Sequence, residues 1–235
     1  MEAIENLMSF GLTRQEASIY MLLFEQGELN GYEVSKLTAI SKSNSYNALA
    51  GLVEKGAAYI IEGSAVLYTP VSIEEFCENK IRLMKNNKSE LIKSVPKRKE
   101  ESDGYITVKS EKHIVDKIKN MLLEARERVY LSMSQGRLQE IIVELDSLKD
   151  RGIKIVIITN STFNFDGAIV YHAKKKPSQI RLIVDSKLVL TGEITDKSNS
   201  TCLYSSNNNL VEVFKDALTN EIKLIQIGKD DYKND

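Results

Sequence analysis

The chain of 235 residues has no tryptophan and contains only two cysteines and two histidines. Cys77 and Cys202 are too few for a disulfide framework, and they lack the spacing of zinc ligands. The histidines, His113 and His172, stand outside any cluster of Cys, His and Asp at ligand spacing. The sequence therefore predicts no metal site and no cofactor.

Long apolar runs are also missing. The longest, such as residues 153–159, are far too short for a membrane span. The first residues, Met-Glu-Ala-Ile-Glu, lack the basic and apolar regions of a secretory signal. We therefore expect a cytoplasmic protein without a membrane partner.

Length and composition predict two domains with apolar cores, since 42% of the residues are hydrophobic and 28% are charged. The net charge of −1 hides an uneven distribution: residues 1–70 carry four cations against eight glutamates, and residues 71–100 carry eight against five. Because phosphate neutralisation supplies much of the affinity for DNA, the acidic first segment argues against tight non-specific binding.

Residues 13–70 nevertheless have the order of elements typical of a winged helix-turn-helix, whose second helix of the pair usually enters a DNA major groove. Thr13 and Glu16 form a capping-box sequence at the start of a helix that Gly27 can end. The expected elements around it are a leader helix at 4–10, a short helix from Asn30, a longer helix from Ser41, and a wing of two strands at 57–61 and 65–69.

A helix of about six turns is expected from Ser72, where a second capping box begins. Cys77, Met84 and Leu91 recur every seven residues on one stripe, which Lys88 interrupts. Such a helix either packs on its own domain or forms a seam between two copies, and the pattern leaves both interpretations open.

The second half of the chain alternates strands with helices, which predicts βαβ units and a mainly parallel sheet. Strands are expected at 105–109, 128–133 and 153–159, with helices at 110–125 and 138–148 between them. Four short strands, at 168–171, 179–184, 187–190 and 201–204, precede a last helix at 210–225.

Several segments match a known family in order and spacing. They include Gly-Leu-Thr-Arg-Gln-Glu-Ala-Ser-Ile-Tyr at 11–20, then residues 31–37, 43–49, 52–56, 68–70 and 72–76. With them, the first hundred residues resemble the TrmB family of transcriptional regulators. The resemblance implies a dimeric DNA-binding regulator, often with a sugar or another small molecule bound in the C-terminal part.

The second half is similar to the phospholipase D-like domain behind some TrmB-type heads. That superfamily uses a His-x-Lys motif with an aspartate further on and Gly-Ser-x-Asn downstream, and its histidine is the nucleophile. If Asp185 is the motif aspartate, the histidine and lysine positions fall on Ser178 and Ile180. Residues 192–195 then read Gly-Glu-Ile-Thr instead of Gly-Ser-x-Asn.

The pair His172 and Lys174 matches the first half of the motif, but Gln179 then stands where the aspartate is needed. The motif fails on either alignment. We therefore predict that the chain is not an enzyme, and keep phosphodiester hydrolysis only as an alternative.

The start of the helix after Ser41 holds the candidate DNA contacts, because asparagine can pair with adenine and lysine with phosphate. Serine and asparagine there are also explained by helix capping. The predicted contacts are Lys42, Ser43, Asn44, Ser45, Tyr46, Asn47 and Lys55.

Cations near strand ends indicate a place for an anionic effector, since open α/β folds tend to bind ligands there. The candidates are His172, Lys174 and Arg181, with Asn160 on a second possible rim. A solvated basic loop explains the same cations.

The complete prediction combines α+β and α/β structure. It comprises a winged helix-turn-helix at 1–71, a linker or dimerisation helix at 72–102, a phospholipase D-like α/β sandwich at 103–228 and a polar tail at 229–235. The predicted function is a homodimeric regulator that binds double-stranded DNA at a two-fold operator. A winged-helix adaptor for another protein is the main alternative.

Overall fold

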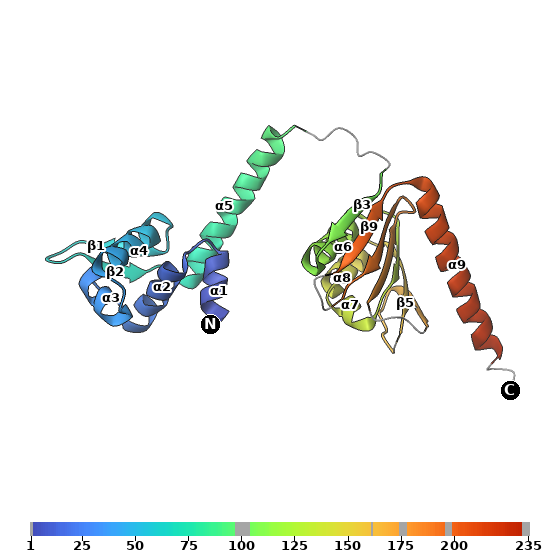
Figure 1. Cartoon of the computed structure of the whole chain (residues 1–235), viewed down its shortest axis with the longest axis horizontal. Coiled ribbons are helices and arrows are strands. Elements are labelled where there is room, and N and C mark those ends of the chain that lie inside the picture. The colour runs from blue at the N-terminus through green and yellow to red at the C-terminus, as the bar shows by residue number, and fades with distance from the viewer. Residues whose placement is uncertain (1, 97–103, 161, 174–177, 196–198, 232–235) are drawn as a thin grey trace. The chain divides into compact units, whose positions relative to one another are not determined.

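The computed structural model describes residues 2–96, 104–160, 162–173, 178–195 and 199–231, with side chains as far as residue 227. The chain divides into two compact units, residues 1–97 and 98–235 (Figure 1). Each unit has its own apolar core.

The first unit has the predicted winged helix-turn-helix architecture. Its two strands pair antiparallel, with Ile61 opposite Leu67 at the tip of the wing. The elements are α1 (Glu2–Ser9), α2 (Arg14–Gln26), α3 (Gly31–Thr38), α4 (Lys42–Glu54), β1 (Ala58–Ile61), β2 (Leu67–Pro70) and α5 (Ile73–Ser94).

The carboxylate of Glu16 joins α2 to α4. The predicted capping box is present, since the Thr13 amide donates to Glu16 Oε2 at 2.6 Å and the Glu16 amide donates to Thr13 Oγ1 at 3.2 Å. Lys55, at the end of α4, donates to the same Glu16 Oε2 at 2.6 Å. Only 8% of the Glu16 side chain is exposed, so this contact links the start of α2 to the end of α4 inside the module.

Gly51 permits this close approach. A Cβ at position 51 would lie 2.3 Å from Glu16 Oε1, so a larger residue there would require the Glu16 carboxylate to shift. Glycine inside a helix costs about 1 kcal/mol relative to alanine. The space that the buried carboxylate needs explains why α4 carries glycine there.

Helix α5 begins on the winged helix and then leaves it. Ser72 accepts a bond from the Glu75 amide, but the Glu75 carboxylate accepts a bond from the Tyr59 hydroxyl of β1 at 2.8 Å. Phe76 is fully buried in the module core, whereas every residue from 81 to 96 is exposed.

The second unit contains a seven-stranded sheet and four helices within its described residues. The predicted helix at 138–148 is divided in two, and the last helix extends beyond the predicted boundary at 228. The elements are β3 (Ile106–Lys109), α6 (Glu111–Glu124), β4 (Arg128–Ser132), α7 (Gln135–Gln139), α8 (Ile142–Asp150), β5 (Lys154–Thr159), β6 (Ala168–His172), β7 (Gln179–Val184), β8 (Leu188–Glu193), β9 (Thr201–Ser205) and α9 (Asn208–Asp231).

The sheet has the order β3-β9-β8-β7-β4-β5-β6. Only β4, β5 and β6 pair in parallel, while the other four pairings are antiparallel. The prediction of a mainly parallel sheet was therefore wrong. A tight turn joins β7 to β8, and such a connection can only produce an antiparallel pair.

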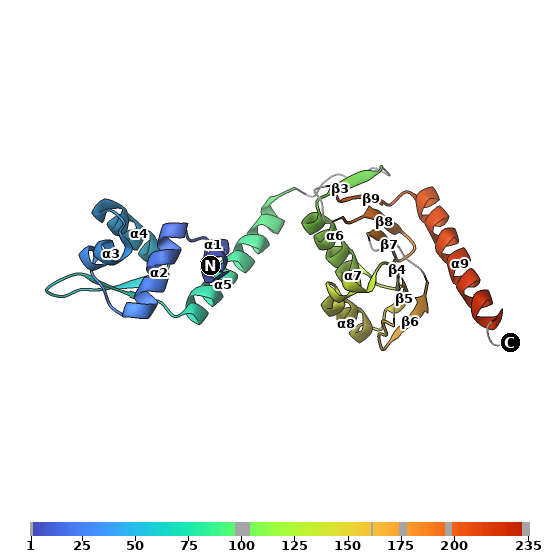
Figure 2. The same cartoon turned by 60° about the horizontal axis from the view of Figure 1, so that its bottom comes forward.

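Helices cover both faces of this sheet (Figure 2). The core on one face combines α6, α7 and α8 with alternate strand residues such as Leu182. On the other face α9 packs against the intervening residues, with Leu218 and Ile183 buried between helix and sheet.

Asp185 fastens the turn between β7 and β8. Its backbone has a φ of 52°, and its carboxylate accepts hydrogen bonds from the amides of Arg126, Glu127 and Arg128 at 2.8–3.2 Å. Burial alone would raise the pKa of Asp185, but these amides and nearby Lys187 outweigh it and lower the pKa below the ordinary 3.8. The residue that could have been a motif aspartate thus anchors the start of β4.

Replacing Glu16 by glutamine tests the link between α2 and α4. We expect Glu16→Gln to lower the free energy of unfolding at neutral pH by about 1–2 kcal/mol, because Lys55 loses its charged partner. Urea titrations followed by circular dichroism would measure the loss, with Glu54→Gln on the exposed side of α4 as the control.

The same variant has a predicted pH dependence. Burial raises the pKa of Glu16, but the bonds from Lys55 and Thr13 outweigh it and leave the pKa below its ordinary 4.5. The stabilisation by the Glu16 carboxylate is therefore complete above pH 4.5, and it disappears as the pH falls through the folded-state pKa. If the difference in the free energy of unfolding between wild type and Glu16→Gln stays the same in stronger acid, this account is contradicted.

Candidate nucleic-acid interface and ligand pocket

The first two turns of α4 present most of the predicted DNA contacts to solvent. Lys42, Ser43, Asn44, Tyr46 and Asn47 are all exposed. Ser41, just before them, caps the helix, because its hydroxyl accepts a hydrogen bond from the Asn44 amide. The side chains at 43 and 44 are therefore not needed for capping.

Two of the predicted contacts are misplaced. Ser45 is 0% exposed because it shares the inward face of α4 with Leu49 and Leu52, so it cannot reach DNA. Lys55 donates to the buried carboxylate of Glu16, and this ion pair gives it a structural role within the module.

Tyr46 packs against the start of α3 while half of its side chain, 49%, stays exposed. A Cβ on Gly31 would lie 2.5 Å from its ring, so a larger residue there would require the ring to move. The ring therefore sets the spacing between α3 and α4 and still borders the exposed surface of α4.

The exposed surface also includes residues of α3 that the sequence analysis did not select. Tyr32 is 53% exposed, and the ammonium of Lys42 lies 4.8 Å from the centre of its ring. Lys36 is exposed in the last turn of α3. The Lys42–Tyr32 contact depends on how α3 meets α4, which the spacing of residues along the chain does not reveal.

The predicted effector residues that the structure describes each make a different contact. Arg181 faces α9 and pairs with Glu221 at 3.2 Å, because it shares a strand face with Ile183. Asn160 Oδ1 accepts a bond from the Gln135 amide, and His172 Nε2 lies 3.2 Å from the carbonyl oxygen of Phe163. Lys174 lies outside the described residues.

A polar pocket lies where β4 and β8 end and β7 begins. Its volume is about 490 Å³, and its lining includes the hydroxyls of Ser134, Ser178 and Thr195. Arg137 and Glu140 contribute the charged groups, and Gly136 also lines the pocket. These residues come from three distant parts of the sequence, and no motif connects them.

The described cation in this pocket is compensated by two carboxylates. Arg137 donates to Glu111 and to Glu140, the latter at 2.8 Å, and only 16% of its side chain is exposed. Burial alone would lower the pKa of Arg137, but the two carboxylates raise it. A site with a neutralised cation and several hydroxyls suits an uncharged polar ligand better than a phosphodiester.

The pocket also coincides with positions of the phospholipase D-like motif. When Asp185 is taken as the motif aspartate, the positions of the catalytic histidine and asparagine are Ser178 and Thr195, and both line the pocket. Neither position carries a nucleophilic imidazole.

The residues that the structure describes contain no group of three or more His, Cys, Asp and Glu side chains that could hold a metal ion. None of the described helices is long and apolar enough to cross a membrane.

Two curated relatives are similar to this chain. The Bacillus subtilis protein described as "Uncharacterized protein YrhO" is 25% identical over 96% of this chain and 86% of its own length. The sugar-sensing transcriptional regulator TrmBL1 of Pyrococcus furiosus is 26% identical over 68% of this chain, a match that spans 48% of the Pyrococcus protein.

Solved structures with related architecture include the archaeal chromatin protein TrmBL2. It is 20% identical with a TM-score of 0.46, and the match covers 94% of this chain and 97% of that chain. The phospholipase D family member Nuc of Salmonella typhimurium is 14% identical with a TM-score of 0.39, over 50% of this chain and 92% of its own.

Two family models match the chain in succession. Residues 7–74 match "Sugar-specific transcriptional regulator TrmB", and residues 104–221 match "Transcriptional regulator TrmB, EBD N-terminal subdomain". The second model alone covers half of the chain, and both models describe regulators rather than enzymes. The chain therefore belongs to the TrmB family of DNA-binding transcriptional regulators.

Proposed function

We propose that this regulator binds a two-fold DNA operator as a homodimer, and that a small-molecule effector in the C-terminal unit changes this binding. The observation that carries the proposal is the exposed face of α4. Its first two turns offer amide, hydroxyl and ammonium groups to a groove, and its first turn contains no acidic residue.

The side chains on that face match the chemistry of DNA. Asn44 and Asn47 have the donor and acceptor pair that recognises adenine in the major groove. Lys42 and Lys36 supply charge for phosphates, which positions a protein on the duplex without reading its sequence.

The net charge of −4 in residues 1–70 is not reduced by the internal ion pairs, because each pair uses one cation as well as one carboxylate. Glu16 is buried and neutralised by Lys55, and Glu5 pairs with Arg14 at 2.6 Å. A weak general attraction to phosphates favours a regulator that depends on base contacts and on two joined copies for its affinity.

The pocket at the ends of β4 and β8 supports the effector part of the proposal. Its hydroxyls and its compensated Arg137 fit a neutral polyhydroxylated molecule, and the family model for the first unit carries the description "sugar-specific". We therefore propose a sugar as the effector class.

DNA binding is tested with duplexes selected from a random library. We expect Asn44→Ala to weaken binding of the selected sequence by about 1–3 kcal/mol, because one base contact is lost. Fluorescence anisotropy would measure it, with Asn164→Ala on an exposed loop of the second unit as the matched control.

Lys42 should behave differently from Asn44. Lys42→Ala is expected to weaken all duplexes similarly and to reduce the slope of log affinity against log salt by about 1. Selection that enriches no sequence, or variants at 42 and 44 that bind like the control, would contradict the proposed interface.

Effector binding is tested by blocking the pocket. A Cβ at Gly136 meets no atom within 4 Å, so Gly136→Phe should fill the pocket without disturbing the fold. A sugar panel in excess should raise the melting temperature of the wild type, because a ligand of the folded state stabilises it. Gly136→Phe should abolish that shift, whereas Val143→Phe on the exposed side of α8 should keep it. A shift that survives in Gly136→Phe would place the ligand elsewhere.

A further inference from the structure

The winged-helix module has few cations with which to hold phosphates. Residues 1–70 contain four basic side chains, those of Arg14, Lys36, Lys42 and Lys55. Arg14 pairs with Glu5 and Lys55 pairs with Glu16, both at 2.6 Å. Within the described residues Lys36 and Lys42 form no ion pair, and Lys42 is the only cation in α4. A phosphate contact from α4 itself therefore depends on Lys42.

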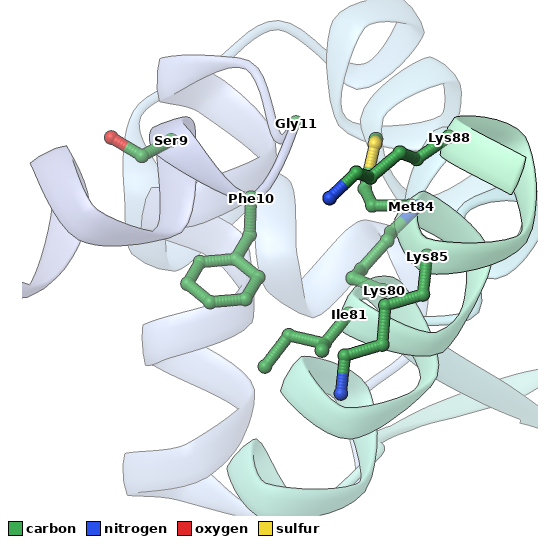
Figure 3. Close-up of a pocket in the computed structure, with 8 residues that line it drawn as sticks. All are labelled: Ser9, Phe10, Gly11, Lys80, Ile81, Met84, Lys85 and Lys88. Atoms are coloured by element: carbon green, nitrogen blue, oxygen red, sulfur yellow. The ribbon is translucent and has the colours of Figure 1, made fainter. Parts of the chain in front are cut away.

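The lysines of α5 belong to a different part of the same unit. Lys80, Lys85 and Lys88 line a groove of about 400 Å³ where α5 passes the end of α1. Figure 3 shows the Phe10 ring facing Ile81 across this groove. None of the residues that line it belongs to α3 or α4. The lysines beside the exposed face of α4 are thus those at positions 36 and 42.

The ring of Tyr32 holds the ammonium group of Lys42. The ammonium lies 4.8 Å from the centre of the ring, and 53% of the tyrosine is exposed. A cation within about 6 Å of the ring centre is attracted by the negative face of an aromatic ring. Tyr32 therefore ties the first residue of α4 to the first turn of α3.

The backbone that carries this ring is fixed by a complete capping box. Asn30 Oδ1 accepts hydrogen bonds from the amides of Tyr32 at 3.0 Å and Glu33 at 2.9 Å, and Glu33 Oε2 accepts one from the Asn30 amide at 2.8 Å. Gly31 is buried where the Tyr46 ring packs. Because these two amides already have an acceptor and Glu33 adds a negative charge, the start of α3 offers a phosphate little by itself.

We propose that Tyr32 is a positioning residue for DNA binding, and that its ring keeps the Lys42 ammonium in place for a phosphate of the duplex. A free lysine side chain has many rotamers, and ordering it on binding costs free energy. The ring removes part of that cost before DNA arrives. This inference rests on the proposed DNA interface of α4 and identifies the residue that prepares its phosphate contact.

The contact can be measured without DNA. Protons above the face of an aromatic ring resonate at lower chemical shift, so the Hε protons of Lys42 should lie upfield of those of Lys36 in the free protein. We expect Tyr32→Phe to keep this upfield shift and Tyr32→Leu to abolish it. Tyr105→Leu, at a tyrosine 60% exposed in the second unit, is the matched control and should keep it. Lys42 protons that resonate alike in wild type and Tyr32→Leu would overturn the proposal.

Fluorescence anisotropy measures the consequence for DNA affinity. We expect Tyr32→Leu to weaken selected and unrelated duplexes alike, by about two- to fivefold, because an exposed contact between a cation and a ring is lost. The loss is uniform because a phosphate contact carries no sequence information. Tyr32→Phe should bind like wild type, since it keeps the ring. Equal weakening by both variants would assign the effect to the hydroxyl and contradict the proposal.

A double-mutant cycle separates positioning from a direct or purely structural role. In the Lys42→Ala background, Tyr32→Leu should leave the affinity unchanged, because the ring no longer has a cation to hold. A further loss of affinity in that background would show that Tyr32 touches DNA itself or supports the fold. Either result would overturn the positioning role.

The Tyr32 proposal and the proposed function can fail separately. An upfield-shifted Lys42 in a protein that selects no DNA sequence would refute the proposed function and leave the contact with Tyr32 in place. Selective DNA binding by a protein whose Lys42 protons show no such shift would refute only the role of Tyr32.

Discussion

The arrangement of the winged helix depends on a buried carboxylate that accepts hydrogen bonds from two groups. Glu16 accepts bonds from the Thr13 amide and from Lys55, and a Cβ at position 51 would force this carboxylate to shift. These contacts fix the start of α2 against the end of α4 at a buried position, where an unpaired charge would be costly. The exposed face of α4 is therefore held by a polar contact as well as by the apolar core. Tyr46 also approaches Gly31 of α3 closely, and a Cβ at position 31 would force its ring to move.

Much of this fold was predictable from local sequence signals. The capping residues at 13, 30, 41 and 72 all act as caps, because such motifs concern residues three apart that meet in any helix. The sheet was predicted less well, since the β7–β8 hairpin depends on the turn at Asp185 rather than on the length of the strands. Ser45 was misjudged because polar residues surround it in the sequence. In the helix it lies on the same face as the buried Leu49 and Leu52, and it is buried with them. Lys55 was misjudged because its partner is 39 residues away.

The second unit has a pocket whose described lining lacks the groups of phosphodiester chemistry. Ser178 and Thr195 lie where the phospholipase D-like motif would need a histidine and an asparagine, and Arg137, the cation among the described lining residues, is bound by two carboxylates. Asp185 is held by three backbone amides, which stabilise its charged form for a structural purpose. Hydroxyl-bearing residues and a compensated cation remain, and these suit recognition of a neutral ligand. In the proposed regulator, a ligand in this pocket changes DNA binding only through a difference in its affinity for two states of the protein.

The central claim is that two α4 helices read one two-fold DNA site. Sequencing of the genomic DNA fragments that the purified protein retains at physiological salt tests it most directly, because specific binding must exceed the excess of competing sites. The account predicts enrichment of a few fragments that share an inverted repeat, with half-site centres about one helical turn or a small multiple of it apart. Uniform retention of all fragments, or enrichment of a motif without two-fold symmetry, would contradict it.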